Sequence, residues 1–370
     1  MTATLDRLDE LLERRAEASE RYFSAESGRL AVLCRALAER FQRGGRLLAV
    51  GGSPQAWSDA HHVAVEFVHP VIVGKRALPA LAVSPDAARA LAGDDDMTIS
   101  FEPLSVVAGE EWILEPEDDD PFVRQELAET AYHVLWELVH VFFEHRGSSS
   151  SGAGSSAFLY PFLDREPQGG DLDAVVEDVQ ASVLMKADEV SELRARTVSD
   201  GRAELLAAAS VIRRALDSGG TLLAFGNGGS ATDAMDVVAD FRAAPQGWPE
   251  RRALDLTDPA ILSAIANDIG PDALYRRQLI AYGRPGDVAL ALTTSGNSRN
   301  VIEGLAEARR RGLETIALVG YDGGRIADEG LADHVIVTPS EHIPRIQEAQ
   351  ATAYHVLREL VEHGEEGEAR

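Results

Sequence analysis

Cysteine is almost absent from this sequence, and long apolar runs are missing altogether. The single thiol, Cys34, excludes a disulfide within the chain. A membrane-spanning helix needs about eighteen consecutive apolar residues, and because no such run occurs we expect none. The first residues are acidic and amphipathic, without a basic segment followed by an apolar stretch, so we expect no secretory signal and a cytoplasmic protein.

Positive charge is also scarce. The chain has 35 Lys and Arg against 61 Asp and Glu, which gives a formal net charge of −26. Nucleic acids and anionic membranes bind to positive fields, so we expect neither as a partner. A small anionic ligand is not excluded, because backbone N–H groups and hydroxyls at a helix start hold a phosphate whatever the charge of the distant surface.

A Gly/Ser-rich segment divides the sequence. Residues 147–157 read GSSSSGAGSSA, the composition of a flexible linker. The chain is long enough for two domains. We therefore expect one domain at 1–146, a linker at 147–170 and a second domain at 171–370.

The two halves resemble each other. Three matching pairs of segments occur in the same order: ALAERFQRGGRLLAVG (36–51) and IRRALDSGGTLLAFG (212–226), DAHHVAVEF (59–67) and DAMDVVADF (233–241), and TAYHVL at 130–135 and 352–357. This pattern predicts an internal duplication. From His62 to His133 is 71 positions, against 119 from Asp236 to His355. We therefore expect the N-terminal copy to lack roughly two strand–helix units.

Apolar runs alternate with helical patterns in the C-terminal half. The candidate strands are TLLAFG, ALDL, DVALALT, ETIALVG and HVIVTP. Buried strands spaced by helices predict an α/β fold with a parallel, doubly wound, flavodoxin-like sheet flanked by helices. We expect two such domains in tandem, the first truncated, with ligands at the carboxyl ends of the strands.

Two loops have the composition of phosphate sites. GNGGSATDA (226–234) follows a candidate strand and opens a helix, where we expect Ser230 to cap the helix and to offer its hydroxyl. TTSGNS (293–298) also lies between a strand and a helix. Hydroxyls and backbone donors at a helix start are what a phosphomonoester needs. The alternative is two ordinary turns, in which Gly, Ser and Asn are common.

These loops and the final helix RIQEAQATAYH (345–355) resemble the SIS (sugar isomerase) domain of the phosphoheptose isomerases. The resemblance covers about 171–363, with a fainter match over 5–145. It implies an isomerase of carbohydrate metabolism that interconverts an aldose and a ketose phosphate, such as sedoheptulose 7-phosphate, through an enediol. It also implies a homo-oligomer, which we expect to be a dimer of tandem chains. The alternative is a non-catalytic protein that senses sugar phosphates to regulate a partner or to assist assembly.

The resemblance assigns roles to particular positions. The phosphate-binding residues would be Asn227, Gly228, Ser230, Thr293, Thr294, Ser295 and Ser298. Asn267 and Asp268, in the turn IANDIG, would contact the hydroxyls of the substrate, and Asp240, Gln347 and His355 would form the catalytic set. Asp240 stands where the family has a glutamate, which makes its side chain shorter by one carbon–carbon bond of about 1.5 Å.

The N-terminal half lacks both loops but keeps a set of candidate metal ligands. Its first turn reads GGSPQAWSDA, and we expect the TTSGNS equivalent to fall in the missing stretch. His62, Glu66, Gln125 and His133 resemble the metal set of zinc-containing family members, so zinc is the candidate cofactor and we predict no other. His62 and Glu66 lie one helical turn apart, which suits a shared ion. Two alternatives stay open: polar residues inherited at a domain interface, and a composite site in which this half supplies acid and base groups to the phosphate loops of the other.

Overall fold

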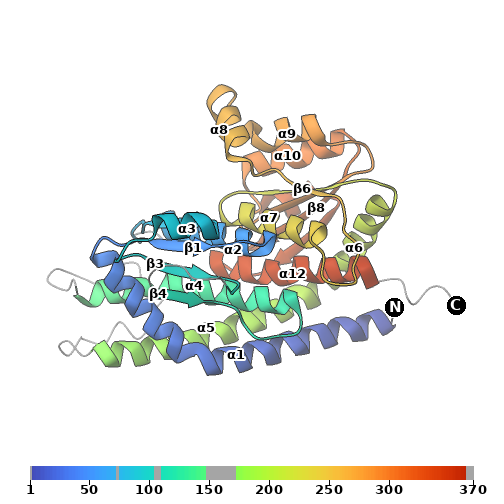
Figure 1. Cartoon of the computed structure of the whole chain (residues 1–370). Coiled ribbons are helices and arrows are strands. Elements are labelled where there is room, and N and C mark those ends of the chain that lie inside the picture. The colour runs from blue at the N-terminus through green and yellow to red at the C-terminus, as the bar shows by residue number, and fades with distance from the viewer. Residues whose placement is uncertain (1, 72–74, 104–109, 147–171, 364–370) are drawn as a thin grey trace. The chain divides into compact units, whose positions relative to one another are not determined.

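The computed structural model describes residues 2–71, 75–103, 110–146 and 172–363, so the Gly/Ser segment lies outside the described residues. The chain forms two compact units, Met1–Arg15 with Val190–Arg370, and Ala16–Glu189. Helices α1 (Thr2–Gln42) and α5 (Leu172–Asp200) each contribute to both units. They run side by side in Figure 1, and in the second unit Gln180 of α5 donates to Ser27 of α1 at 3.2 Å. The units therefore exchange short segments at their ends, which the sequence limits 1–146 and 171–370 do not anticipate.

The unit formed by residues 1–15 and 190–370 contains a five-stranded parallel sheet in the order β6-β5-β7-β8-β9. Its strands are β5 (Leu222–Gly226), β6 (Ala253–Asp255), β7 (Val288–Thr293), β8 (Glu314–Gly320) and β9 (His334–Thr338). Each of the five apolar runs identified in the sequence forms one of these strands.

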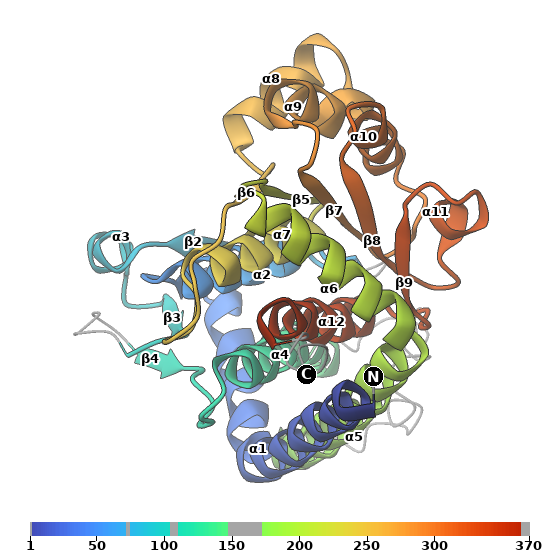
Figure 2. The ribbon, with the colours of Figure 1, turned by 90° about the vertical axis from the view of Figure 1, so that its right-hand side faces the viewer.

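Helices cover both faces of this sheet (Figure 2). One face carries α6 (Arg202–Asp217), α7 (Gly229–Arg242) and α12 (Ile343–His363); the other carries α8 (Pro259–Asp268), η2 (Pro271–Ala273), α9 (Leu274–Tyr282), α10 (Arg299–Arg310) and α11 (Gly324–Asp328). Successive strand residues point to opposite faces. Leu222 and Ala224 accordingly belong to the first core, and Leu223 and Phe225 to the second. This is the predicted doubly wound arrangement.

The unit formed by residues 16–189 contains a four-stranded parallel sheet in the order β2-β1-β3-β4. Its strands are β1 (Leu47–Val50), β2 (Ala80–Val83), β3 (Met97–Ser100) and β4 (Glu110–Ile113), and its further helices are α2 (Pro54–Val68), α3 (Pro85–Leu91) and α4 (Pro121–Arg146). When β1–β4 are matched with β5–β8, the strand order is the same in both sheets. The predicted fold class is therefore confirmed.

The smaller sheet is covered unequally. Leu47, Ala49 and Ile99 face a large core shared with α1, α2, α4 and α5. On the opposite face, Leu48 and Val50 join a small cluster to which α3 contributes. Within the described residues the smaller sheet has no counterpart of β9, and no helix corresponds to α10 or α11. The elements without a counterpart there are one strand and two helices, against the predicted two strand–helix units.

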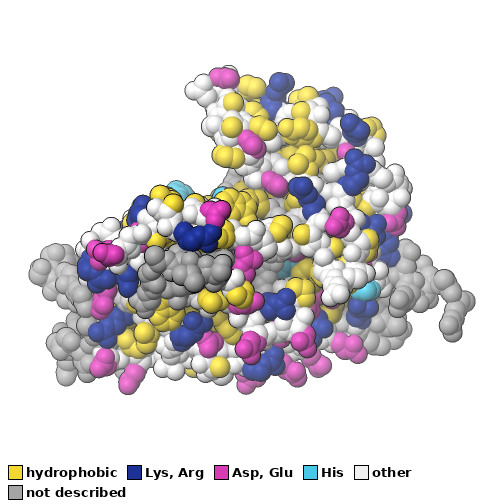
Figure 3. All heavy atoms as spheres, viewed as in Figure 1, with side chains coloured by type: hydrophobic (Ala, Val, Ile, Leu, Met, Phe, Trp, Pro, Cys, Tyr) yellow, Lys and Arg dark blue, Asp and Glu magenta, His cyan; other side chains and the backbone are white. Residues whose placement is uncertain are grey.

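Among the described residues, no helix combines the length and the apolar character that crossing a membrane requires. On the face in Figure 3, Lys and Arg side chains are scattered among Asp and Glu side chains. Cys34 lies in the core, where burial raises the pKa of its thiol and keeps it protonated.

Candidate active site

The first candidate phosphate loop joins β5 to α7. Gly226 ends the strand, and a Cβ at this position would come within 2.4 Å of the Ser230 carbonyl oxygen, so the helix start can approach the strand only over a glycine. Gly228 has φ +58°, a backbone conformation that L side chains rarely adopt. Apart from atoms of Gly228 and the residues next to it in the chain, nothing lies within 4 Å of the position that a Cβ on Gly228 would take, which leaves space beside the loop.

Ser230 does not cap this helix, and that prediction was wrong. The N-cap is Gly228, without a side-chain capping hydrogen bond, and α7 begins at Gly229. Because the chain turns into the helix at a glycine with positive φ, Ser230 already lies inside the first turn. Its side chain is buried.

The second candidate phosphate loop joins β7 to α10. Thr293 is the last residue of the strand, and Ser298 is the N-cap of the helix, where its hydroxyl makes no capping hydrogen bond. The hydroxyl oxygens of Thr293 and Ser298 lie 3.5 Å apart. Asn297 shapes the loop, because its amide donates to the Ser295 carbonyl at 2.8 Å and accepts from the backbone N–H of Arg325 at 3.1 Å.

Side chains outside both motifs fasten the two loops together. The amide of Asn227 donates to Asn300 Oδ1 at 2.9 Å, and the amide of Asn300 donates back to Asn227 Oδ1 at 2.8 Å. The Tyr275 hydroxyl donates to the Gly226 carbonyl and lies 3.0 Å from Asn227 Oδ1. Burial raises the pKa of Tyr275, so this hydroxyl stays a neutral donor. Sequence reasoning missed Tyr275 and Asn300, although Asn300 stands only two positions after TTSGNS.

A buried group of titratable side chains lies between α7 and α12. His355 Nε2 is 3.3 Å from Asp240 Oδ2 and 3.7 Å from Asp236 Oδ2. The Tyr354 hydroxyl donates to Asp236 Oδ2 at 2.7 Å. The structure thus brings together the predicted residues Asp240 and His355 and adds Asp236 and Tyr354. An imidazole in contact with two carboxylates can pass protons to and from a bound substrate.

The helix that carries His355 also reaches the second loop. Gln347, a predicted site residue, is buried two turns before His355 on α12. Gln350, which sequence reasoning missed, places its Nε2 atom 3.5 Å from the Thr293 carbonyl oxygen. One helix therefore links the second candidate phosphate loop to the buried group of titratable side chains.

Asn267 and Asp268 are not in a turn as predicted. They are the last two residues of α8, both exposed, and the Asn267 amide donates to Asp268 Oδ1 at 2.7 Å. The helix continues through them because the glycine that ends it, Gly270, comes two positions later with φ +117°.

The N-terminal half retains the strand that precedes the second candidate phosphate loop, while residues 104–109, where most of a corresponding loop would fall, lie outside the described residues. In the smaller sheet Val50 pairs with Ser100, and in the larger sheet its match Phe225 pairs with Ala291. The register therefore places Glu102 where the other half has the first threonine of TTSGNS. The strand before this loop, β3, is therefore present, and the expectation that the TTSGNS equivalent is missing concerns residues that lie mostly outside the described ranges.

Glu102 is bonded to the loop that corresponds to GNGGS. Its Oε1 atom accepts from the backbone N–H groups of Gly52, at 2.6 Å, and Ser53, at 3.1 Å. Ser53 is the N-cap of the fifteen-residue helix α2. A carboxylate of the protein itself thus occupies the helix start, where the positive end of the helix dipole attracts anions.

The predicted metal ligands of this half converge only in part. His62 Nε2 lies 3.3 Å from His133 Nε2 and 3.9 Å from Glu66 Oε1, with all three side chains buried. Glu129, one helical turn before His133 on α4, brings a carboxylate oxygen within 4.8 Å of a ring nitrogen of each histidine. Gln125 is buried one turn further back.

The donor set around the two histidines fits a divalent metal. Burial and the neighbouring His133 hold the pKa of His62 well below its ordinary value of 6.5, and neutral imidazole is the form that binds zinc. Glu129 was not predicted, although its four-residue spacing to His133 repeats that of His62 and Glu66. Asp236, Asp240 and His355 form a second group in which ligand atoms lie within 4.8 Å of one another.

Comparison with known proteins identifies the family. The SIS domain family matches residues 187–320. The phosphoheptose isomerase of Chlorobium phaeobacteroides is 41% identical over 199 residues, which cover 52% of this chain and 86% of that protein. The chain belongs to the SIS domain family. The phosphoheptose isomerase of Aquifex aeolicus is likewise similar to this SIS protein, with 42% identity over 178 residues that cover 47% of this chain and 91% of that protein.

The likeness in fold extends beyond the SIS match. The structure of the C-terminal domain of glucosamine-fructose-6-phosphate aminotransferase from Francisella tularensis aligns with 96% of this chain and 94% of that one, with a TM-score of 0.58 and 11% sequence identity. At this identity the comparison concerns the fold alone. It supports the conclusion that both halves of this SIS protein are α/β domains with parallel sheets.

Proposed function

We propose that this SIS protein is a sugar-phosphate isomerase whose active site lies in its C-terminal half. The observation that carries the proposal is the contact of 3.3 Å between His355 Nε2 and Asp240 Oδ2, buried on helices that lead directly to both phosphate loops. The relatives named phosphoheptose isomerase favour sedoheptulose 7-phosphate, or a sugar phosphate like it, as the substrate.

Helix α7 spaces the two parts of the site. The phosphate would bind between the loops at the start of α7 and α10, where helix dipoles and backbone N–H groups favour an anion. Asp236 and Asp240 lie six and ten residues beyond Ser230, which corresponds to about 9 Å and 15 Å along a helix. An open-chain sugar held by its terminal phosphate would extend along this distance toward His355.

The chemistry needs one base and one acid at adjacent carbons. The base removes the proton from the carbon beside the carbonyl, while the acid protonates the carbonyl oxygen, which gives an enediol. The proton is then returned to the former carbonyl carbon, and the neighbouring hydroxyl loses its proton to become the new carbonyl. His355 and Asp240 would share these transfers, and Tyr354 would position Asp236 beside them through its hydrogen bond of 2.7 Å. Positioned acid–base groups of this kind contribute about 10²–10⁴ in rate.

The test is proton NMR of the purified protein with sedoheptulose 7-phosphate in deuterated water. We expect conversion with deuterium incorporated at the reacting carbon, lost in His355→Ala and Asp240→Asn. His133→Ala, the matching change in the N-terminal half, should retain the activity. If His133→Ala loses the activity, the composite site is supported, in which the N-terminal half supplies acid and base groups. Binding without conversion or exchange by the unmodified protein would contradict catalysis and favour the sensing or assembly role.

We further propose that the N-terminal half binds one zinc ion. The favouring observation is the convergence of His62 Nε2 and His133 Nε2 at 3.3 Å beside the carboxylate of Glu129. These three residues would hold the ion, which when bound would act as a Lewis acid or as a cross-link between α2 and α4. Metal content measured by mass spectrometry should be one zinc per chain, reduced in His133→Ala and unchanged in His355→Ala; the reverse pattern would place the metal in the C-terminal half.

A further inference from the structure

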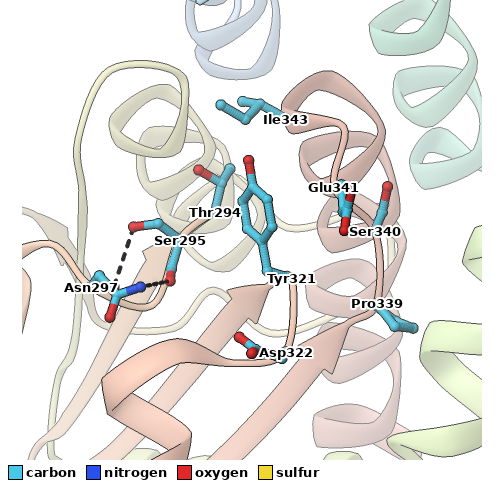
Figure 4. Close-up of a pocket in the computed structure, with 9 residues that line it drawn as sticks. All are labelled: Thr294, Ser295, Asn297, Tyr321, Asp322, Pro339, Ser340, Glu341 and Ile343. Atoms are coloured by element: carbon cyan, nitrogen blue, oxygen red, sulfur yellow. Dashed lines mark hydrogen bonds between the residues drawn. The ribbon is translucent and has the colours of Figure 1, made fainter.

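A cavity of about 530 Å³ lies at the carboxyl ends of β7, β8 and β9, beside the first residue of α12 (Figure 4). This volume is in the range of small-molecule sites, about 300–1,000 Å³. The polar lining residues that could contact a ligand through hydroxyl or carboxylate groups are Thr294, Ser295, Tyr321, Asp322, Ser340 and Glu341. Only the first two belong to a motif recognised in the sequence.

The cavity adjoins the second phosphate loop and not the acid–base group. Thr294 and Ser295 form part of its wall. His355 stands twelve residues after Ile343, the residue of α12 that lines the cavity, and this corresponds to about 18 Å along the helix. Residues of the cavity therefore contact a ligand near its phosphate and take no part in proton transfer at His355.

Tyr321 is held in the cavity by an unusual backbone. Its φ of +54° is the only positive value for a non-glycine residue in the described parts of the chain, and such a conformation is strained, so it persists only where the surroundings hold it. Two features fix it: the backbone N–H of Tyr321 donates to the Ser340 carbonyl at 3.2 Å, and a Cβ on the preceding Gly320 would approach the Thr294 carbonyl oxygen to 2.3 Å. Figure 4 shows the ring standing between Thr294 and Glu341.

The lining selects hydroxyl groups over further anions. Asp322 and Glu341 offer carboxylate oxygens, which accept hydrogen bonds and repel negative charge. Asp322 is itself fixed by the backbone N–H of Gly324, which donates to its Oδ1 atom at 3.1 Å. The hydroxyls of Thr294, Ser295 and Ser340 can donate and accept, and the ring of Tyr321 presents an apolar face to carbon-bound hydrogens.

We propose that this cavity binds a hydroxyl-bearing carbon chain next to the phosphate loop, with Glu341 and Asp322 as acceptors and Tyr321 as the apolar wall. The chain is either the part of the sugar phosphate nearest its phosphate, with the reacting end still directed toward His355, or a separate, unphosphorylated sugar. The inference deepens the proposed function, because it names residues that select the sugar. It concerns binding alone and does not require that the protein isomerises its ligand.

The test compares three probes by calorimetry: inorganic phosphate, sedoheptulose 7-phosphate and unphosphorylated sedoheptulose. Two variants remove the recognition groups. Tyr321→Asn deletes the ring while keeping a residue that tolerates positive φ, and Glu341→Gln neutralises an exposed carboxylate. Glu314→Gln is the matched control, since Glu314 is exposed at the opposite, amino end of β8.

We expect both variants to weaken binding of one sugar probe about 5- to 10-fold, the effect of a lost hydrogen bond or ring contact, and to leave inorganic phosphate unaffected. A loss confined to sedoheptulose 7-phosphate identifies the substrate's own chain as the occupant, and a loss for unphosphorylated sedoheptulose identifies a separate molecule. Unchanged affinity for both sugars in both variants overturns the proposal. Binding without conversion would contradict the isomerase and leave this inference intact.

Discussion

The side-chain amides of Asn227 and Asn300 hydrogen-bond to each other in both directions, at 2.9 and 2.8 Å, and so join the ends of two loops that are seventy-three residues apart in the chain. The proposed phosphate site uses both loops, so binding there would depend on their separation. The amide pair fixes that separation before any ligand arrives, which reduces the entropy lost on binding.

Removal of this amide pair should weaken phosphate binding. We expect Asn300→Ala to raise the dissociation constant for inorganic phosphate about 10-fold, the equivalent of one or two hydrogen bonds. Calorimetry measures the change, and Asn267→Ala, at an exposed asparagine on α8, serves as the control. An unaltered dissociation constant in Asn300→Ala would show that the loops hold their spacing by other contacts.

The carboxylate of Glu102 should limit the protein to one anion site per chain. It accepts from the N–H groups of Gly52 and Ser53, the donors that a phosphate would use in that half. We expect one inorganic phosphate per chain in the unmodified protein and a second, weaker one in Glu102→Ala. Glu102→Gln is the matched control, because its amide oxygen can still accept from both N–H groups. Equal stoichiometry in all three proteins would refute this prediction.

The proposed metal should stabilise the N-terminal half. Removing zinc by chelation should lower the temperature of unfolding in the unmodified protein, and less so in His133→Ala, because binding stabilises only the folded state. Parallel measurements on Glu129→Gln and Gln125→Ala distinguish the ligand set of the structure from the set read from the sequence. If Gln125→Ala loses more zinc than Glu129→Gln does, the ligand set predicted from the sequence is favoured.

The ion pair of Asp96 with Arg46 should make stability depend on pH in the acid range. The guanidinium approaches the carboxylate to 2.6 Å, and the backbone N–H groups of Gly93 and Arg46 donate to it as well. These donors lower the pKa of Asp96 from 3.8 to about 2. Because the folded pKa is depressed, the stabilisation is present above the unfolded value and is lost as the pH falls through about 2.

Asp96→Asn should therefore destabilise the protein by about 1–2 kcal/mol at neutral pH. This is less than the full pKa shift implies, because Arg46 is partly exposed and water screens the ion pair. Urea unfolding at two pH values measures the effect. The difference from the unmodified protein should shrink near pH 3, whereas Asp95→Asn, at a surface pair with Arg43, should matter little at either pH. A difference that does not change with pH would contradict the assignment.

Local sequence patterns predicted the elements of the fold and the loops of the site. Apolar runs such as DVALALT gave every strand of the larger sheet, because a strand covered on both faces must be apolar along its length. The loops at Gly226 and Thr293 were recognisable because glycine and hydroxyl residues follow those strands directly. His355 and Asp240 were paired through the family resemblance, and the structure places them in contact.

Local sequence patterns could not predict the contacts between segments that are distant in the chain. Glu102 replaces a threonine only when the register of β3 against β1 is known, and Glu129 joins the two histidines only because α2 and α4 pack together. Ser230 was predicted to cap α7, but the position of the cap depends on backbone angles. Gly228, with φ +58°, turns the chain into the helix and is the N-cap itself. Each of these features depends on a conformation or a partner that residue type alone does not specify.

The sharing of α1 between the two compact units has a practical consequence. Leu8 and Leu11, near its start, belong to the core beneath β5 and α12, and Arg15 forms a buried ion pair with Glu359 at 2.9 Å. A fragment beginning at residue 171 would lack these residues, so its inactivity would reveal an incomplete core and say nothing about catalytic groups in the other half. A chain cleaved within 147–170 should behave differently: its two pieces remain interlocked through α1 and α5 and should purify together as one nicked protein.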